Sequence, residues 1–154
     1  MSGEAAWGRA GLLAAAVLIA DQLTKQLVRS SIALGATRHL LPGVTLVHAQ
    51  NSGIAFSLLT GSEIGVIVVT LVVVGAILAY FARQSGRRGM WIACGLVVGG
   101  AVGNLLDRLR AGLVTDFIKL PHWPAFNLAD AAITLGVLTL FVIVGRGGAA
   151  ARPA

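Results

Sequence analysis

The segment Ile64–Phe81 reads IGVIVVTLVVVGAILAYF and contains no charged residue in eighteen positions. As a helix it would carry β-branched and other apolar side chains on every side, so it would have no polar face to turn toward water. Its length suffices to cross a hydrocarbon core of about 30 Å. The segment therefore predicts a membrane-spanning helix, and the rest of the chain is interpreted around it.

The composition agrees with a membrane protein. Of the 154 residues, 56% are hydrophobic and 12% are charged, whereas a typical soluble domain is about 25% charged. Three further apolar segments with polar residues at one end are weaker candidates for spans: Trp7–Val28, Met90–Leu106 and Leu128–Val144. Four spans leave room for one helical bundle, so we expect a single integral-membrane domain over 1–154, with a flexible C-terminal tail over 146–154.

Basic residues set the expected orientation. Arg83, Arg87 and Arg88 crowd the short loop between the second and third spans, a density typical of the cytoplasmic side. The total number of basic residues does not indicate the orientation, because six of the twelve Lys and Arg fall on each side. Both termini are then cytoplasmic. Aromatic residues fall at the two interfaces, with Trp7, Tyr80 and Trp91 inside and Trp123 outside.

The net charge of +6 does not indicate a nucleic-acid partner, because the basic residues lie singly between apolar spans and form no stripe. The single cysteine, Cys94, lies inside an apolar segment. It excludes an intrachain disulfide framework and is typical of a small buried apolar residue.

The first span has a start similar to a secretory signal peptide, with an apolar run over 10–20. Leu18 occupies the position where cleavage after this run requires a small residue, and the helical pattern continues to Val28, so we expect a retained span. Asp21 and Lys25 then lie one turn apart on one face. We expect them to point into the bundle, because ionisable groups in membranes rarely face lipid; an ordinary solvated helix end is the alternative.

Two short segments have strand character: Gly43–His48, which follows a Pro-Gly turn, and Leu113–Ile118. The first lies in the long connection 29–62. It is followed by Asn51–Ser57, small polar residues and then the aromatic Phe56, where Gly53 permits a close backbone approach. Taken alone, this last segment is equally well explained as a plain loop.

The end of the third span combines small and polar residues. Gly99 and Gly103 form a small-xxx-small face that lets helices approach closely. Asn104 and Arg108 share a face one turn apart, with Asp107 beside them. Ordinary helix packing and a polar helix end explain this segment equally well when it is considered alone.

The acidic residues gather on the outer side, namely Asp21, Glu63, Asp107, Asp116 and Asp130. Asp116 lies in the second predicted strand, and Asp130 lies one turn into the last span, just after Asn127, a favourable helix N-cap residue. Two carboxylates near a water–hydrocarbon boundary tend to share one proton near neutral pH. One can then act as a general base on water while the other protonates or polarises a carbonyl oxygen.

Other chemistries fit less well. His39, His48 and His122 all lie in loops, and neither a serine nucleophile motif nor zinc-ligand spacing such as HExxH occurs. A proton-coupled transporter or channel subunit also carries aspartates in its spans, but typically at the midplane and with internal repeats. The residues therefore favour a membrane aspartyl hydrolase, with a small proton-coupled membrane transporter or channel subunit as the alternative. A membrane scaffold without enzymatic activity stays formally open.

Five motifs in order resemble the lipoprotein signal peptidases, that is, bacterial signal peptidase II. They are Asp21-Gln22-x-x-Lys25, Asn51-x-Gly53-x-Ala55-Phe56-Ser57, Gly99-Gly100-Ala101-x-Gly103-Asn104-x-x-Asp107-Arg108, Val114-x-Asp116-Phe117 and Phe126-Asn127-x-Ala129-Asp130. The resemblance implies a mainly α membrane protein of four transmembrane helices, with a small extracytoplasmic β-sheet and a short helix beside the site.

The resemblance also implies the activity. An aspartic endopeptidase of the bacterial cytoplasmic (inner) membrane would cleave lipid-modified prolipoproteins just before the diacylglyceryl cysteine, without metal or cofactor, at the extracytoplasmic face. Asp116 and Asp130 would be catalytic. Residues expected to hold the site or bind substrate are Asp21, Lys25, Asn51, Gly53, Phe56, Asn104, Asp107, Arg108 and Asn127. We further expect membrane phospholipid as a partner and a monomeric state.

Two supporting roles are hypotheses from spacing. Asn127 is expected to cap the last helix and orient Asp130, and its loss to alanine would then cost about 1 kcal/mol. Arg108 is expected either to orient Asp107 or to contact lipid headgroups.

Overall fold

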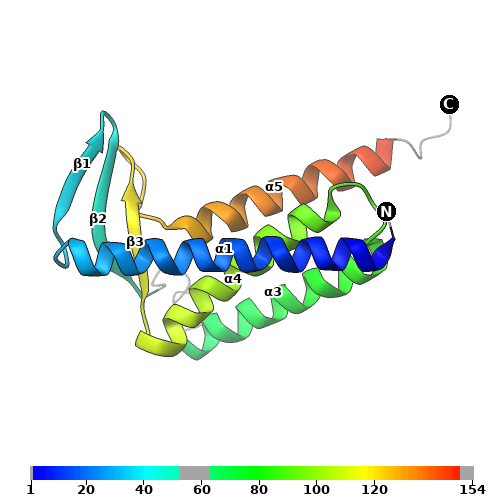
Figure 1. Ribbon diagram of the computed structural model, residues 1–154, viewed down its shortest axis with the longest axis horizontal. Helices are drawn as coiled ribbons and strands as arrows, with labels where there is room; N and C mark the ends of the chain where they lie inside the picture. The colour runs from blue at the N-terminus through cyan, green and yellow to red at the C-terminus, as the bar shows by residue number, and fades with distance from the viewer. Residues whose placement is uncertain (1, 53–62, 150–154) are drawn as a thin grey trace.

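The computed structural model describes residues 2–52 and 63–149. It contains four long helices and one small sheet at one end of the helices (Figure 1). The helices are α1 (Gly3–Ser31), α3 (Glu63–Gln84), α4 (Met90–Ala111) and α5 (Leu128–Ala149). By length and composition each of them can cross a membrane, as predicted for the four spans.

The sheet is antiparallel, with strand order β1-β2-β3. Its strands are β1 (Thr37–Leu41), β2 (Val44–Asn51) and β3 (Val114–Lys119). β2 and β3 are the two predicted strands, whereas β1 was not predicted. β1 is exposed along its whole length, so its sequence TRHLL carries no alternation of buried and exposed residues that would indicate a strand.

Strand register brings two segments that are distant in sequence to one point. Ala49 pairs with Asp116 and Asn51 pairs with Val114 across β2 and β3. Asn51 and Asp116 are thus diagonal neighbours on one face of the sheet. The sheet is also tied to the end of α1, because His48 bonds the carbonyl oxygen of Ile32 through Nδ1 at 2.8 Å.

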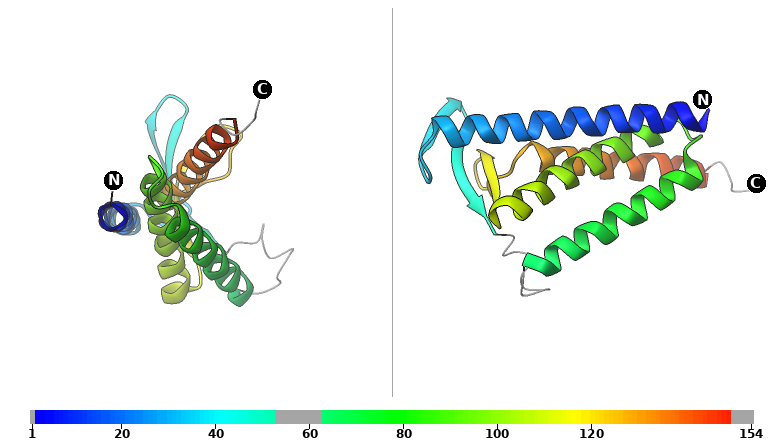
Figure 2. Two further views of the ribbon diagram at one scale, coloured as in Figure 1. Left: turned by 90° about the vertical axis from the view of Figure 1, so that its right-hand side faces the viewer. Right: turned by 60° about the horizontal axis from the view of Figure 1, so that its bottom comes forward.

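Helix α4 is central and packs against α1, α3 and α5 (Figure 2). Glycines permit these contacts: a Cβ on Gly99 would lie 2.7 Å from the Ala14 carbonyl oxygen of α1, and one on Gly100 would lie 2.5 Å from the Ala129 carbonyl oxygen of α5. The small-residue face predicted in the sequence is therefore the packing face of the bundle.

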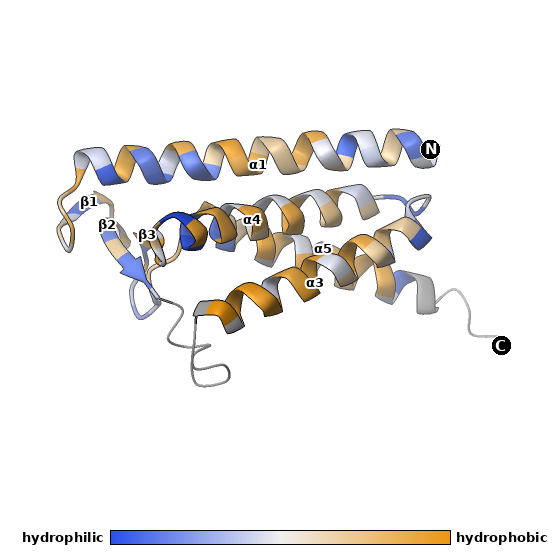
Figure 3. Cartoon of the chain, turned by 90° about the horizontal axis from the view of Figure 1, so that it is seen from below, coloured by the Kyte–Doolittle hydropathy of each residue, from blue (hydrophilic) through white to orange (hydrophobic). Residues whose placement is uncertain are grey.

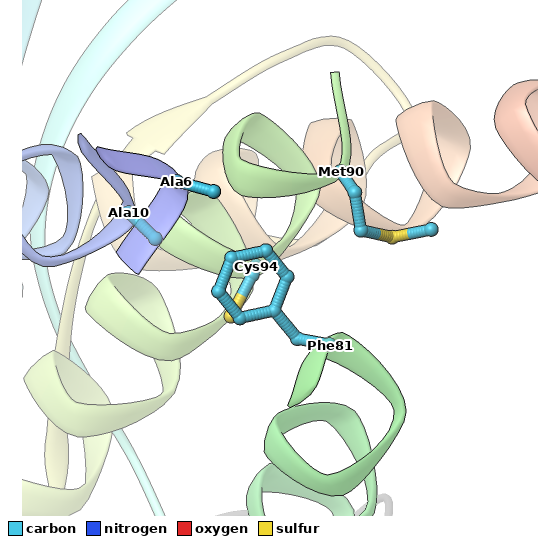
Figure 4. Close-up of a cluster of buried hydrophobic side chains, with 5 residues drawn as sticks. All are labelled: Ala6, Ala10, Phe81, Met90 and Cys94. Carbon is cyan, nitrogen blue, oxygen red and sulfur yellow. The ribbon is translucent and has the colours of Figure 1, made fainter. Parts of the chain in front are cut away.

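Helix α3 is held mainly near its C-terminal end. There Phe81 points from α3 toward Cys94 of α4, in a buried cluster that also contains Ala6, Ala10 and Met90 (Figure 4). Trp7 adds an edge-to-face contact with the Phe81 ring, with centroids 4.7 Å apart. Nearer the sheet, α3, α4 and α5 surround a cavity of about 490 Å³.

The outer surface of the bundle suits lipid. Figure 3 shows that α3 is hydrophobic along nearly all of its length, and large exposed apolar residues include Ile64, Leu71, Leu138 and Phe141. Figure 1 shows the start of α1 and the end of α5 at the end of the bundle opposite the sheet.

Two expectations need correction or lie outside the described residues. Residues 146–149, expected in the flexible tail, form the last turn of α5, and no proline lies between Leu128 and Pro153 to interrupt its backbone hydrogen bonds. The short helix implied by the resemblance does not occur in 2–52 or 63–149, and it stays a prediction.

Gly103→Ala is expected to destabilise the bundle. Its Cβ would lie 2.7 Å from Asp21 Oδ2, so the Asp21 carboxylate must be displaced or α1 and α4 must move apart, at a cost of about 1–3 kcal/mol. Gly75→Ala is the matched control, because a Cβ at Gly75 of α3 meets nothing within 4 Å. Thermal unfolding in detergent measures both, and equal transition temperatures for the two variants would contradict this packing.

Candidate active site

Asp116 lies near the middle of β3 and is almost completely buried. Its carboxylate accepts two hydrogen bonds from side-chain amides: Asn51 Nδ2 at 3.0 Å and Asn127 Nδ2 at 2.7 Å. One donor comes from the neighbouring strand and the other from the residue that precedes α5. The sheet and the start of the last helix together fix this carboxylate.

Asp130 lies in the first turn of α5 and forms a reciprocal cap with Asn127. The Asp130 N–H donates to Asn127 Oδ1 at 2.9 Å, and the Asn127 N–H donates to Asp130 Oδ2 at 3.1 Å. This is the capping-box arrangement, in which the cap residue and the third helical residue satisfy each other's backbone donors. The predicted capping position of Asn127 is confirmed, and the cap also fixes the Asp130 carboxylate.

Asn127 joins the two aspartates. It is fully buried, bonds Asp116 through its amide nitrogen and bonds the Asp130 backbone through its amide oxygen. Asn104 of α4 completes the connection, since its Nδ2 donates to Asp130 Oδ1 at 2.8 Å and its Oδ1 accepts from Asn127 Nδ2 at 3.2 Å. Asn127 is therefore bonded to both aspartates, and Asn104 holds Asn127 and Asp130 together.

A buried lysine of α1 is bonded to this network of asparagines and aspartates. Lys25 has no exposed side-chain surface and donates to Asp21 Oδ2 at 2.8 Å, Asp107 Oδ2 at 2.9 Å and Asn104 Oδ1 at 2.9 Å. Asp21 Oδ1 in turn accepts the backbone N–H of Ala129, in the first turn of α5, at 3.0 Å. The predicted inward face of α1 is confirmed, and it binds both α4 and the start of α5.

Three residues of this network were not among the predicted site residues, although Gln22 stands in the first of the five motifs. Gln22 Nε2 donates to Asp21 and Asp107, each at 3.2 Å; Arg29 Nη1 lies 3.8 Å from Asp107 Oδ1, and it donates to Thr115 Oγ1 at 3.1 Å. Arg29 continues the spacing of Asp21 and Lys25 by a further four positions, which is a signal present in the sequence. Thr115 has no such signal, because only the fold brings it to α1.

The environment of Asp116 favours its protonated form. Burial is the main cause that raises the pKa of Asp116 to about 6. The negative charge of Asp130 also acts upward, while the amide donors Asn51 and Asn127 act in the opposite direction. A carboxyl group that holds its proton to about pH 6 beside a second carboxylate is suited to general acid–base chemistry.

Arg108 lies in the wall of the cavity between α3, α4 and α5, together with Asn104 and Asp130. Its Nη1 donates to the Asn104 carbonyl oxygen at 3.3 Å. Asp107 is oriented by Lys25 and Gln22 instead, so the hypothesis that Arg108 orients Asp107 has no support in these contacts. The rest of the cavity wall is mainly apolar: Val66, Val69, Val73, Val97, Ala101 and Ile133, with Thr70 and Thr134.

Most of the residues singled out from the sequence thus meet at one place. Asp21, Lys25, Asn51, Asn104, Asp107, Asp116, Asn127 and Asp130 form the connected network, and Arg108 lies beside it. Gly53 and Phe56 lie outside the described residues. Within the described chain, no group of three or more His, Cys, Asp or Glu is arranged to hold a metal ion.

The sequence profile of the family described as "Signal peptidase (SPase) II" matches residues 13–145, which include every aspartate of this network. The chain belongs to the signal peptidase II family. The protein is therefore a membrane peptidase, and the match gives no support to a transporter.

Named relatives and solved structures agree with this signal peptidase II assignment. The lipoprotein signal peptidase of Syntrophotalea carbinolica is 40% identical over 89% of this chain and 91% of its own, and that of Nitratidesulfovibrio vulgaris is 40% identical over 87% of each. A solved bacterial membrane enzyme superposes with a TM-score of 0.85 at 27% identity, over 96% of this chain and 93% of that one. Four helices with a small sheet are thus the fold of this signal peptidase II.

Lys25→Met is expected to destabilise this signal peptidase II by about 3–5 kcal/mol, because it leaves Asp21 and Asp107 buried without their shared cation. Arg29→Met is the matched control: its side chain is one-third exposed and its ion pair is long, so its effect should stay within about 1 kcal/mol. Unfolding in detergent measures both. Equal losses of unfolding free energy in the two variants would contradict the conclusion that Lys25 is the cation on which Asp21 and Asp107 depend.

Proposed function

We propose that this protein is an aspartic endopeptidase that removes the signal peptide from diacylglyceryl-modified prolipoproteins, cleaving before the lipidated cysteine. The observation that carries the proposal is the pair Asp116 and Asp130, both bonded to the single residue Asn127. The family assignment and the names of the relatives, lipoprotein signal peptidases, supply the substrate class.

In the proposed mechanism the two carboxyl groups share one proton and hold a water molecule between them. The ionised member removes a proton from the water, which attacks the scissile carbonyl carbon. The protonated member donates its proton to the carbonyl oxygen, which gives a tetrahedral diol. As the C–N bond breaks, the first member passes the proton it took from water to the leaving amine, and the second member recovers a proton from a hydroxyl of the diol. The raised pKa of Asp116 suits it to carry the shared proton in the free enzyme.

The supporting residues have distinct roles in this proposal. Asn51, Asn104 and Asn127 orient the carboxylates through the bonds described above. The helices α1, α4 and α5 are held together next to these carboxylates by Lys25, Asp21 and Asp107. Arg108 faces the substrate or a lipid phosphate from the cavity wall, and Gly53 and Phe56 are proposed to contact substrate from the connection before α3.

The cavity is the proposed site for the lipid-anchored end of the substrate. It has a mainly apolar wall at the level of the helices and reaches Asp130 at one end. Acyl chains in the apolar part would place the adjacent peptide bond near the carboxylates. Membrane phospholipid is then a neighbour of the site, and one copy of the chain supplies every group of the mechanism, so we propose a monomer.

The proposed location is the bacterial cytoplasmic membrane, with both termini in the cytoplasm and the sheet outside. The arginines of the short α3–α4 loop, and the position of the start of α1 and the end of α5 opposite the sheet, support this orientation. The scissile bond of an exported lipoprotein would then lie on the side of the membrane where Asp116 lies.

Cleavage of a diacylglyceryl-modified prolipoprotein by the purified protein in detergent tests the proposal. Asp116→Asn and Asp130→Asn should each lower kcat by about 10²–10⁴-fold or more, because each removes one proton-transfer group. Glu4→Gln is the matched acid-to-amide control, since Glu4 lies in the first turn of α1 at the far end of the bundle, and it should cleave as the wild type does.

The same prolipoprotein without its lipid should be cleaved poorly by the wild type. Undiminished turnover by both aspartate variants, with their folding verified by thermal unfolding, would place the active site elsewhere and refute the proposal.

A further inference from the structure

Exposed apolar side chains gather at one end of the sheet. Leu40 and Leu41 close β1, and Trp123 lies in the loop between β3 and α5; each is more than half exposed. The register places them at the same end, because β1 and β2 turn at Leu41 and Val44, and the end of β3 pairs beside this turn, with Lys119 opposite Thr45. We name Leu40, Leu41 and Trp123 the apolar tip.

The fold fixes the apolar tip in place. Phe126 exchanges two backbone hydrogen bonds with Ile118, at 2.8 and 2.9 Å, and so pins the far side of the loop that carries Trp123. Within this loop the Trp123 N–H donates to the Leu120 carbonyl oxygen at 3.2 Å. Exposure of the indole is therefore a property of a structured loop.

The tip also points away from the bundle. Seen along the long axis, the β1–β2 hairpin extends sideways beyond α1 and α5 (Figure 2, left). Hydrogen bonds of His48 tie the sheet to the end of α1, and Figure 1 shows the β1–β2 hairpin lying across the direction of the helices at that end. In a membrane spanned by α1, a sideways projection at this end would lie over the lipids beside the bundle.

Charges around the tip suit anionic headgroups. The exposed residues Arg38 and Lys119 flank the tip, and the sequence has no acidic residue in 37–44 or 117–125. Basic residues beside apolar ones are the pattern that attracts a segment to anionic lipid surfaces. Aromatic rings such as that of Trp123 favour the headgroup level of a bilayer.

We propose that the apolar tip inserts into the headgroup–acyl boundary of anionic phospholipids, in the leaflet on the sheet side of the membrane. The tip and Asp116 belong to one hydrogen-bonded sheet, so this contact sets the depth of the carboxylate relative to the bilayer. The inference does not depend on the proposed peptidase activity, and its test measures only the depth of Trp123 in the bilayer.

The experiment uses the full chain with Trp7→Phe and Trp91→Phe, so that Trp123 is its only tryptophan. The protein is placed in bilayers of phosphatidylcholine with phosphatidylglycerol. Lipids brominated near the headgroup should quench the Trp123 fluorescence more strongly than lipids brominated near the chain end. Acrylamide in the water should quench it several-fold less than it quenches free tryptophan.

Leu41→Ser, added to this protein, should increase the quenching by acrylamide. Leu34→Ser is the matched control, because Leu34 is about equally exposed (61% against 63%) but lies in the turn after α1, away from the tip. Bilayers of phosphatidylcholine alone should give weaker quenching by the brominated lipids.

Full quenching of Trp123 by acrylamide, without quenching by either brominated lipid, would overturn the proposal. Equal quenching by the brominated lipids with and without phosphatidylglycerol would overturn the requirement for anionic headgroups.

Discussion

The ion pairs of Lys25 are the interaction on which the rest of the structure depends. This ammonium group has no exposed surface and contacts carboxylates from two helices, Asp21 of α1 and Asp107 of α4. Asp21 also accepts a backbone N–H from the first turn of α5. One buried cation therefore fixes three helices at the end where Asp116 and Asp130 lie.

Burying the charges of Lys25, Asp21 and Asp107 is favourable only when all three are present together. A lone carboxylate or ammonium in a low-dielectric interior is costly, and the cost is offset only when partners satisfy its remaining donors and acceptors. Two carboxylates face Lys25, Gln22 donates a further hydrogen bond to Asp107, and the charge of Arg29 lies within ion-pair distance of it. The same requirement explains Gly103, because any side chain there would displace the Asp21 carboxylate.

Neutral asparagine side chains connect the ion pairs of Lys25 to Asp116 and Asp130 without adding charge. An asparagine side chain both donates and accepts hydrogen bonds, so Asn104 can accept from Lys25 and donate to Asp130. Asn127 does the same between Asp116 and the backbone of α5. The hydrogen-bonded network is thus made by α1, α4, β2, β3 and the start of α5, while a cavity remains beside it between α3, α4 and α5.

The sequence predicts much of this arrangement, but not all of it. Uninterrupted apolar runs predict the helices, and the spacing of Asp21 and Lys25 predicts an inward face of α1. The exposed strand β1 has no periodic signal, and the glycine-rich end of α5 has no residue that shows where the helix ends. The pairing of Lys25 with Asp107 and the contact of Arg29 with Thr115 arise only when distant segments pack, so no local pattern indicates them.

A titration of the aspartate carboxyl groups tests the shared proton most directly. Carbon-13 NMR of protein labelled at its four aspartates follows each carboxyl group, and Asp116→Asn identifies the signal of Asp116. Because burial and the charge of Asp130 raise the pKa of Asp116 to about 6, Asp116 should stay protonated through pH 4–5 and ionise near pH 6. Its ionisation should move to lower pH in Asp130→Asn. An Asp116 signal that titrates near the ordinary pKa of an aspartate, about 3.9, and does not respond to Asp130→Asn would contradict the account.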